Sequence, residues 1–281
     1  MIKYNNIKVD GKKISPSSLN TFRRNKKEWL KSFRGEASFV GNYSSILGTV
    51  IHYVFESEFD KRTGACYYQD TREYVDSEAE RNTISQQEAD EIYQLMVSGY
   101  YARCVSWLMN EDTMKVVDSE PEVVHKLGKA GNETYYIAGS IDALIIDDSD
   151  VLEDSDLSVN KTNKLPKGKL GIRDYKSSKR KALSMSGYLS QLLTYVVAYN
   201  ATHERKVEFI EVINIVTTKT KGLQFYTMRY NFTEDDLKKV KALLKEIINS
   251  LKLIETNPVL EPYIFSAGVS FMGTFDLLKE D

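Results

Sequence analysis

The chain has 281 residues, of which 42% are hydrophobic and 28% charged, and its formal net charge is −2. This is the composition of an ordinary globular protein, and the length is sufficient for one large domain. Two cysteines, Cys66 and Cys104, are too few for a disulfide framework or a cysteine-ligated metal cluster. Because no apolar run reaches membrane-spanning length and no signal-peptide core is seen, we expect a cytoplasmic protein without a membrane partner.

The first hundred residues have mostly helical patterns. Ser15-Pro16-Ser17-Ser18 predicts a helix start, because serines cap free N–H groups and proline is tolerated in the first turn. The apolar face of this helix runs on to Leu30. Residues 73–110 form a second amphipathic region, in which Ser85-Gln86-Gln87-Glu88 resembles a capping box. We therefore expect residues 14–110 to form an N-terminal helical part.

Between these regions, a helix is expected to begin near Ser45. Gly48, His52 and Glu56 are four residues apart, so they share one face of this helix. His52 is one of only three histidines in the chain, which makes it a candidate metal ligand, and Glu56 is a possible accessory acid.

Strand patterns follow. Pro121–Leu127 and Tyr135–Ile146 form a predicted hairpin around residues 128–132, and Leu170–Lys176 forms a further strand. Side chains alternate between the faces of a strand, so Asp174 and Lys176 point to one side and Tyr175 to the other. If the two longer strands are neighbours, Asp142 lies beside Asp174.

Two adjacent carboxylates repel each other unless a cation sits between them, so this juxtaposition predicts a divalent-metal site next to Lys176. A further acid, Glu120 or Glu122, is expected near Asp142 on the same meander. Which of the two faces inward depends on a strand register that the sequence leaves open.

The interval 147–169 is acidic in its first half and basic in its second, and it has no apolar period. This pattern predicts a mobile charged loop. Positive charge continues beyond it at the following possible DNA-binding residues: Arg173, Lys179, Arg180 and Lys181. A positive belt around paired acids suits an enzyme that acts on a phosphate backbone.

The remaining chain alternates helix and strand. A helix is expected over Gly187–Ala201, with Gln191 and Tyr195 on one face. Strands 207–216 and 223–230 form a predicted hairpin, and Thr233 caps a long helix that runs through Leu253. The prediction is one domain over 1–281, with a catalytic core at 118–230 and a C-terminal helix and tail at 233–281.

Four short motifs occur in order: Gly48-x-x-x-His52, Gly139-x-x-Asp142, Asp174-x-Lys176 and Gln191-x-x-x-Tyr195. Together they resemble the PD-(D/E)XK nuclease superfamily, specifically its RecB-like exonuclease branch, over about residues 14–230. The resemblance implies an α/β fold with a restriction-endonuclease-like core, in which a small mixed central β-sheet is flanked by helices.

The resemblance also implies residue roles. The implied metal ligands are the side chains of His52, Asp142 and Asp174 and the main-chain carbonyl of Tyr175. Lys176 would orient the attacking water or help to deprotonate it, while Gln191 and Tyr195 would position the DNA end or support Lys176. Oxygen-rich ligation suits Mg²⁺, and one imidazole makes Mn²⁺ suitable as well. Either one ion or two would act.

Some members of this branch carry an iron–sulfur cluster on four cysteines. The first of these would fall near Asn25, and this sequence has no C-terminal cysteine trio. No iron–sulfur cluster is therefore expected.

These observations predict a metal-dependent DNA exonuclease that hydrolyses phosphodiester bonds from DNA ends. Recombination, replication or repair in a phage or bacterium is the expected setting, with a recombination or replication protein as a possible partner. An endonuclease of the restriction or CRISPR-adaptation type is one alternative, and a non-catalytic DNA-binding module on the same fold is another. Digestion polarity, strand preference and oligomeric state do not follow from the sequence.

Overall fold

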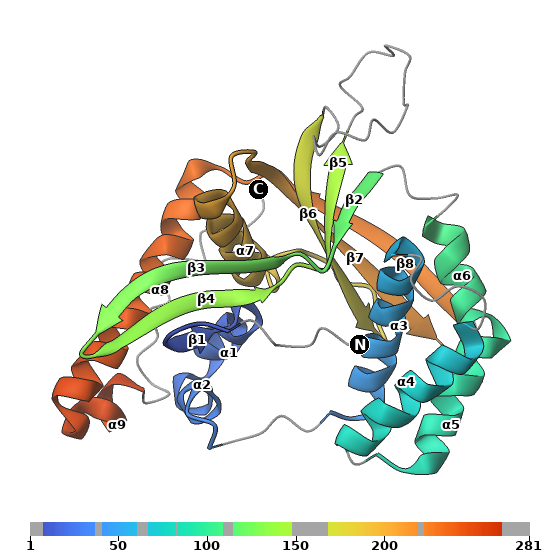
Figure 1. The fold of residues 1–281 in the computed structure, drawn as a ribbon, viewed down its shortest axis with the longest axis horizontal. Helices are drawn as coiled ribbons and strands as arrows, with labels where there is room; N and C mark the ends of the chain where they lie inside the picture. The colour runs from blue at the N-terminus through green and yellow to red at the C-terminus, as the bar shows by residue number, and fades with distance from the viewer. Residues whose placement is uncertain are drawn as a thin grey trace.

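The structure is a computed structural model that describes residues 8–36, 41–60, 67–82, 84–108, 115–147, 168–218 and 222–265. Its centre is a five-stranded sheet in the order β2-β5-β6-β7-β8 (Figure 1). The strands are β2 (Lys115–Ser119), β5 (Ala143–Asp147), β6 (Lys169–Ser178), β7 (Val207–Thr218) and β8 (Gly222–Tyr230). Only β6 and β7 run parallel, which makes the sheet mixed. The small mixed sheet flanked by helices is therefore confirmed.

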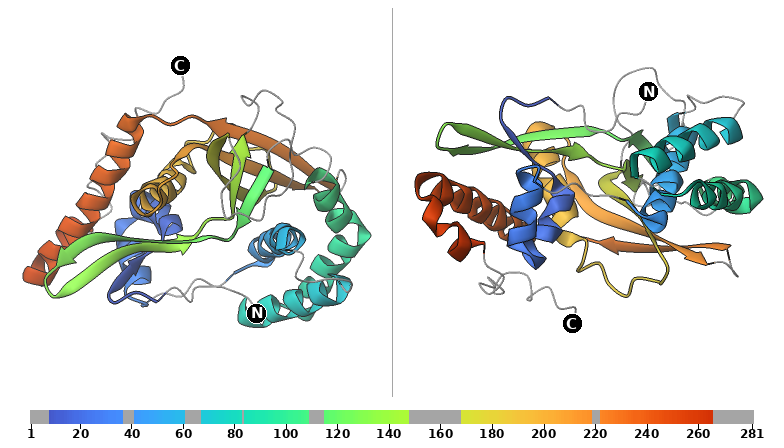
Figure 2. Two further views of the ribbon diagram at one scale, coloured as in Figure 1. Left: turned by 45° about the horizontal axis from the view of Figure 1, so that its top comes forward. Right: turned by 90° about the horizontal axis from the view of Figure 1, so that it is seen from below.

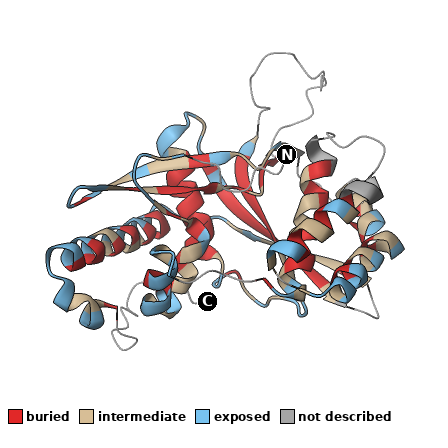
Figure 3. Cartoon of the chain, turned by 60° about the horizontal axis from the view of Figure 1, so that its bottom comes forward, coloured by how far each residue is buried: buried red, intermediate tan, exposed pale blue. Residues whose placement is uncertain are grey.

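The three central strands of this sheet, β5, β6 and β7, are buried on both faces (Figure 3). Because neighbouring residues point to opposite faces, Leu144 and Ile172 join the core that contains α7 (Leu189–Thr202). Ile145 and Tyr175 join the opposite core, which contains α3 (Tyr43–Asp60). α7 is also the crossover between the parallel strands β6 and β7, a connection that parallel strands require.

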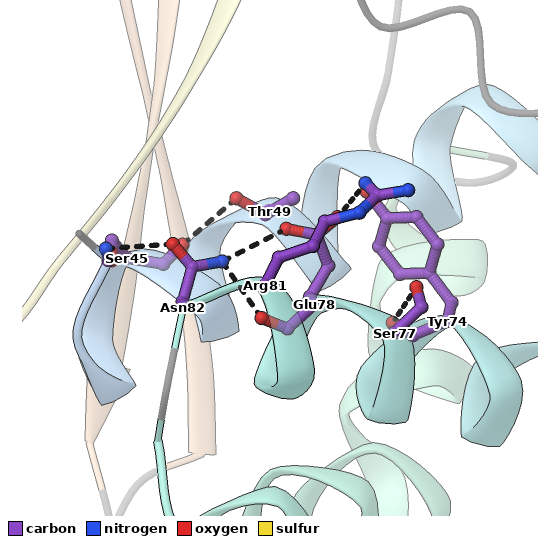
Figure 4. A network of polar contacts seen from close by, with 8 residues as sticks. Ser45, Thr49, Tyr74, Ser77, Glu78, Arg81 and Asn82 are labelled. Atoms are coloured by element: carbon purple, nitrogen blue, oxygen red, sulfur yellow. Dashed lines mark hydrogen bonds and ion pairs between the residues drawn. The ribbon is translucent and has the colours of Figure 1, made fainter. Parts of the chain in front are cut away.

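Three helices extend the α3 side: α4 (Tyr67–Asn82), α5 (Gln86–Leu95) and α6 (Tyr101–Ser106). The helix expected over 73–110 is broken after Asn82, and Gly99 in the π-helical turn Met96–Tyr100 has a φ of 147°, which favours glycine. The capping box of Ser85 and Glu88 is confirmed. Asn82 ties the end of α4 to the segment before α3, since its Oδ1 accepts from the Gly41 N–H at 2.7 Å, and within α4 its Nδ2 donates to the Glu78 carbonyl at 2.8 Å (Figure 4).

On the other side of the molecule lies a second sheet, of order β1-β4-β3 (Figure 2). Its strands are β1 (Lys12–Ile14), β4 (Glu133–Ser140) and β3 (Glu122–Ala130). The sequence predicted its β3–β4 hairpin, which is confirmed, but not that the hairpin belongs to a separate sheet. Around it lie α1 (Leu19–Arg24), α2 (Lys26–Phe33), α8 (Glu234–Thr256), the 3-10 turn Pro258–Leu260 and α9 (Glu261–Ile264). Trp29 is central to this side, with its ring stacked 4.9 Å from that of Phe33.

The single strand predicted over Tyr135–Ile146 is wrong. The chain leaves the three-stranded sheet at Ser140 and enters the five-stranded sheet at Ala143, so Asp142 lies at the junction. Two backbone hydrogen bonds hold the junction, from Ile141 N to Pro121 O at 3.1 Å and from Glu120 N to Asp142 O at 3.2 Å. Period-two alternation continues across such a bend, which is why the sequence pattern gave no sign of it.

Two N-terminal details also differ from expectation. The helix expected from Ser15 to Leu30 is a 3-10 turn at Pro16–Ser18 followed by α1 and α2, and Ser15 makes no side-chain cap. Asn25 separates the two helices because its backbone is extended, with φ −153°, while its side chain accepts a hydrogen bond from Glu28 N and caps α2.

At the other end of the chain, Thr233 and Asp236 form a capping box at the start of α8, as expected. Residues 148–167 of the charged loop lie outside the described residues, and so does Cys66. Among the described helices, none is long and apolar enough to cross a membrane.

Candidate active site

The junction between β4 and β5 delivers Asp142 to the end of β6. Ala143 pairs with Arg173 in the antiparallel β5–β6 ladder, so the next step along each strand sets Asp142 opposite Asp174. The contact is anchored by the backbone, since the Tyr175 N–H donates to Asp142 Oδ2 at 2.8 Å. The predicted juxtaposition of the two acids is thus present in the fold.

Asp174 is buried, and only one of its two carboxylate oxygens accepts hydrogen bonds from described residues. Lys176 Nζ donates to Asp174 Oδ1 at 2.8 Å, and Gln191 Nε2 on α7 donates to the same oxygen at 3.3 Å. Asp174 Oδ2 is buried and has no hydrogen-bond partner among the described residues. A buried carboxylate oxygen in this condition costs free energy, so the position needs a ligand to satisfy it.

His52 approaches from α3. Its Nδ1 is 3.4 Å from Asp142 Oδ2, and its ring lies edge-on to that of Tyr175 with 5.9 Å between centroids. Burial, and then the positive charge of Lys176, lower the pKa of His52 to about 4, although Asp174 and a backbone hydrogen bond with Tyr175 oppose the shift. The imidazole is therefore neutral at physiological pH, the form in which it can bind a metal.

The charged groups of the site shift one another's pKa values. Burial raises the pKa of Asp174 to about 6 and also raises that of Asp142, while the Lys176 ammonium opposes both shifts. Burial acts to lower the pKa of Lys176, but the two carboxylates outweigh it and hold that pKa above its usual value. When both acids are ionised, two carboxylates face one ammonium, which leaves an excess of negative charge for a cation to balance.

Tyr195 on α7 lies close to Gly139 on β4 and within reach of the charges of both acids. A methyl group in place of the Gly139 hydrogen would be only 3.2 Å from the Tyr195 hydroxyl, so the β4 backbone approaches the ring closely. Burial, and then the charges of Asp142 and Asp174, raise the pKa of Tyr195 well above its usual value. Its hydroxyl therefore stays protonated and can act as a hydrogen-bond donor.

The donor set fits a hard divalent cation. Among the described residues no three His, Cys, Asp or Glu side chains already surround a single point as ligands. Nevertheless two buried carboxylates meet here, one of them with a bare oxygen, and a neutral imidazole adjoins the other. Carboxylate oxygens are the ligands that Mg²⁺ and Mn²⁺ prefer.

Arg173 is buried in the fold and cannot reach a phosphate backbone at the surface, which corrects its assignment as a DNA-binding residue. Arg173 is 1% exposed, its Nε is 2.7 Å from Glu211 Oε1, and its guanidinium lies 5.4 Å from the centre of the Trp107 ring. The reason is strand alternation: Arg173 shares the α3 face of β6 with Tyr175, whereas Asp174 turns to the α7 face.

The other predicted residues are dispersed. Lys179, Arg180 and Lys181 are exposed directly after β6. Glu120 lies close enough to the site for its charge to raise the pKa of Tyr195. Glu122 is instead exposed on β3, where its charge acts on Lys13. Glu56 is partly buried on α3, one turn after His52.

One residue near the site was missed by the sequence analysis. Asn214 is fully buried in β7, in register with Lys176, and its Nδ2 donates to the Lys176 carbonyl at 3.2 Å. A polar side chain within the apolar run Val-Ile-Asn-Ile-Val was the available signal, since a buried amide must be hydrogen-bonded.

The family model that matches this chain is that of the PD-(D/E)XK nuclease superfamily, over residues 13–259. The chain belongs to this superfamily. Its members generally use divalent metal ions, and hydrolysis of nucleic acid is the activity that membership supports.

Among solved structures, the fold is similar to the crystal structure of a "putative exonuclease" from Eubacterium rectale, with a TM-score of 0.51. The identity is 10%, and the match covers 91% of this chain and 86% of the other. At this identity the likeness concerns the fold alone. No curated protein sequence matches the chain.

Proposed function

We propose that this PD-(D/E)XK protein is a DNA exonuclease that depends on Mg²⁺ or Mn²⁺ and digests DNA from its ends. The observation that carries the proposal is the buried, unpartnered Asp174 Oδ2 beside Asp142 and Lys176. RecB-like membership, and a setting in recombination, replication or repair with or without a partner protein, belong to the same proposal.

Each side chain has a role in this proposal. Asp142 and Asp174 would hold the cation, with His52 and the Tyr175 carbonyl as further ligands. When bound, a divalent ion lowers the pKa of a water and offsets charge on the scissile phosphate. Lys176 is charged and hydrogen-bonded to Asp174, so it is placed to orient the water and to stabilise negative charge at the phosphate.

On α7, Gln191 is proposed to hold Asp174 in its orientation through the 3.3 Å hydrogen bond. The protonated Tyr195 hydroxyl is proposed to donate a hydrogen bond toward the DNA end. Exposed cations at Lys179, Arg180 and Lys181 would contact the phosphates nearby.

The test is a digestion time course on 5′- and 3′-labelled single- and double-stranded DNA with Mg²⁺ or Mn²⁺. Asp174→Ala and Lys176→Ala should each lower the rate by at least about a hundredfold, because each removes an electrostatic contribution to the transition state. Asp118→Asn, which changes an exposed carboxylate on β2, is the matched control and should digest DNA at the wild-type rate. Circular dichroism verifies folding, and full activity in either site variant would refute the site.

Two further measurements distinguish an exonuclease from an endonuclease and from a non-catalytic DNA-binding module. A covalently closed circular DNA must survive an exonuclease, whereas an endonuclease would cut it. A non-catalytic module would bind DNA in EDTA, measured by filter binding, and would leave every substrate intact with Mn²⁺. Retention of His52, Asp142, Asp174 and Lys176 in one site favours the enzyme over the module.

A further inference from the structure

The segment that joins β6 to α7, residues 179–187, is called the site loop below. It begins directly after the strand that carries Asp174 and Lys176, and it ends two residues before the first residue of α7, the helix that carries Gln191 and Tyr195. The loop therefore joins the two elements that carry the candidate site residues Asp174, Lys176, Gln191 and Tyr195. Its residues Lys179, Arg180 and Lys181 are exposed.

The site loop is fastened to the sheet through Asn214. Asn214 Oδ1 accepts from the Ala182 N–H at 2.7 Å, and its Nδ2 donates both to the Lys176 carbonyl and, at 2.9 Å, to Ser178 Oγ. One buried amide thus connects the backbone of the lysine motif to the middle of the site loop. Lys181 adds a second attachment, with its Nζ 4.4 Å from the centre of the Tyr226 ring on β8.

A third attachment follows within three residues. Met185 is 7% exposed and belongs to the core around α7, and its carbonyl accepts from Tyr188 N at 2.8 Å. Ala182 and Met185 are therefore both held. Between them, Leu183 is exposed, whereas Ser184 is only partly exposed.

Leu183 is 94% exposed, which makes it the most exposed large hydrophobic side chain among the described residues. A single exposed leucine is common and needs no explanation on its own. This one differs because it stands on a fastened loop, next to three exposed cations and between the two elements of the site. Apolar side chains inserted between bases are a known way for proteins to unstack nucleic acid, with cations on the flanking phosphates.

We propose that Leu183 packs against the terminal bases of a DNA duplex and unstacks the end pair, with Asn214 as the residue that positions it. The proposal rests on the proposed function, because it assigns the substrate of the same site as a paired end that must be opened. Lys179, Arg180 and Lys181 would bind the phosphates on either side. Opening the pair would let one strand continue toward Asp174.

The first experiment needs no cleavage. Duplex DNA with 2-aminopurine at its terminal pair is titrated with the full chain in EDTA, and a rise in fluorescence reports unstacking. The wild type should give the rise, while Leu183→Ala should remove most of it even at saturating protein. Leu253→Ala, which truncates another exposed leucine on α8, is the matched control and should behave as the wild type.

The second experiment measures digestion. The ratio of the rate on a fully paired end to the rate on an end with three unpaired bases should fall about tenfold in Leu183→Ala, since only the paired end has to be unstacked. Asn214→Ala should also lower this ratio. Leu183→Met should keep the wild-type ratio, because it retains an apolar side chain at this position.

The outcomes separate the two proposals. An unchanged 2-aminopurine signal in Leu183→Ala, or no rise with the wild type, overturns the role of Leu183 whether or not the protein digests DNA. A rise that depends on Leu183 without any digestion would support the wedge and refute the exonuclease. An equal loss of digestion on paired and unpaired ends would also overturn the wedge.

Discussion

Gly48 shows how one residue sets the distance between α3 and β6, the strand that carries Asp174 and Lys176. A Cβ at this position would fall far inside contact distance of Ser177 Oγ on β6, but at 3.5 Å from Ser177 Cβ, an ordinary contact. The clash is therefore with the hydroxyl alone. His52 follows Gly48 by one helical turn, so this close approach also determines how near the imidazole comes to Asp142.

We expect Gly48→Ala to be destabilising in the wild-type background and stabilising in a Ser177→Ala background. In the helix itself, alanine is favoured over glycine by roughly 1 kcal/mol, and removing Ser177 Oγ removes the clash that offsets this gain. The measurement is a double-mutant cycle by urea unfolding, with a coupling of about 1 kcal/mol expected. Additive effects of the two substitutions would show that α3 has room to move.

At the scale of elements, the parallel pair β6 and β7 is held by a buried charge pair as well as by its ladder. Arg173 and Glu211 are in register on neighbouring strands and are each 1% exposed. A buried charge that loses its partner is costly, whereas a buried pair in place is close to neutral. The pair thus penalises any other register of the strand that carries Asp174 and Lys176.

Glu211→Ala should lower the free energy of unfolding by about 3–5 kcal/mol, because it leaves the Arg173 charge without its carboxylate. Glu208→Ala, which changes an exposed carboxylate on the same strand, should alter it by no more than about 0.5 kcal/mol. Chemical denaturation followed by circular dichroism gives both values. A loss at Glu211 as small as that at Glu208 would mean that Arg173 reaches solvent or another acid.

At the scale of the whole molecule, two hydrophobic cores lie on opposite faces of the central sheet. The chain has two tryptophans, and they report on different cores: Trp29 lies in the core with α7 and α8, and Trp107 in the core with α3. β5, β6 and β7 contribute side chains to both cores. This sharing is the physical basis for predicting one cooperative domain.

The single-domain prediction is testable with Trp29→Phe and Trp107→Phe, each of which leaves one tryptophan. In each variant the midpoint of thermal unfolding by fluorescence should equal the midpoint by far-ultraviolet circular dichroism, as two-state unfolding requires. Two separate transitions, with one tryptophan following each, would divide the chain into two domains.

The sequence by itself determined the superfamily and which residues to expect at the candidate site. Asp174-x-Lys176 in a strand places both side chains on one face, because a strand has a two-residue period. That Asp142 lies opposite Asp174 was expected only if the two strands were neighbours, and the fold supplies that pairing. The helix starts at Ser85 and Thr233 were also readable, since a side-chain cap is a local interaction.

Only the tertiary structure decided what depends on long-range packing. It split the run at Ile141-Asp142 between two sheets and turned Arg173 inward to Glu211. It also tied the site loop to Asn214, about thirty residues later in the chain. The physical reason is that burial and hydrogen-bond partners depend on which segments pack together in the assembled fold. The two-residue period of a strand does not report this, because it is the same whether the segment stays in one sheet or is divided between two.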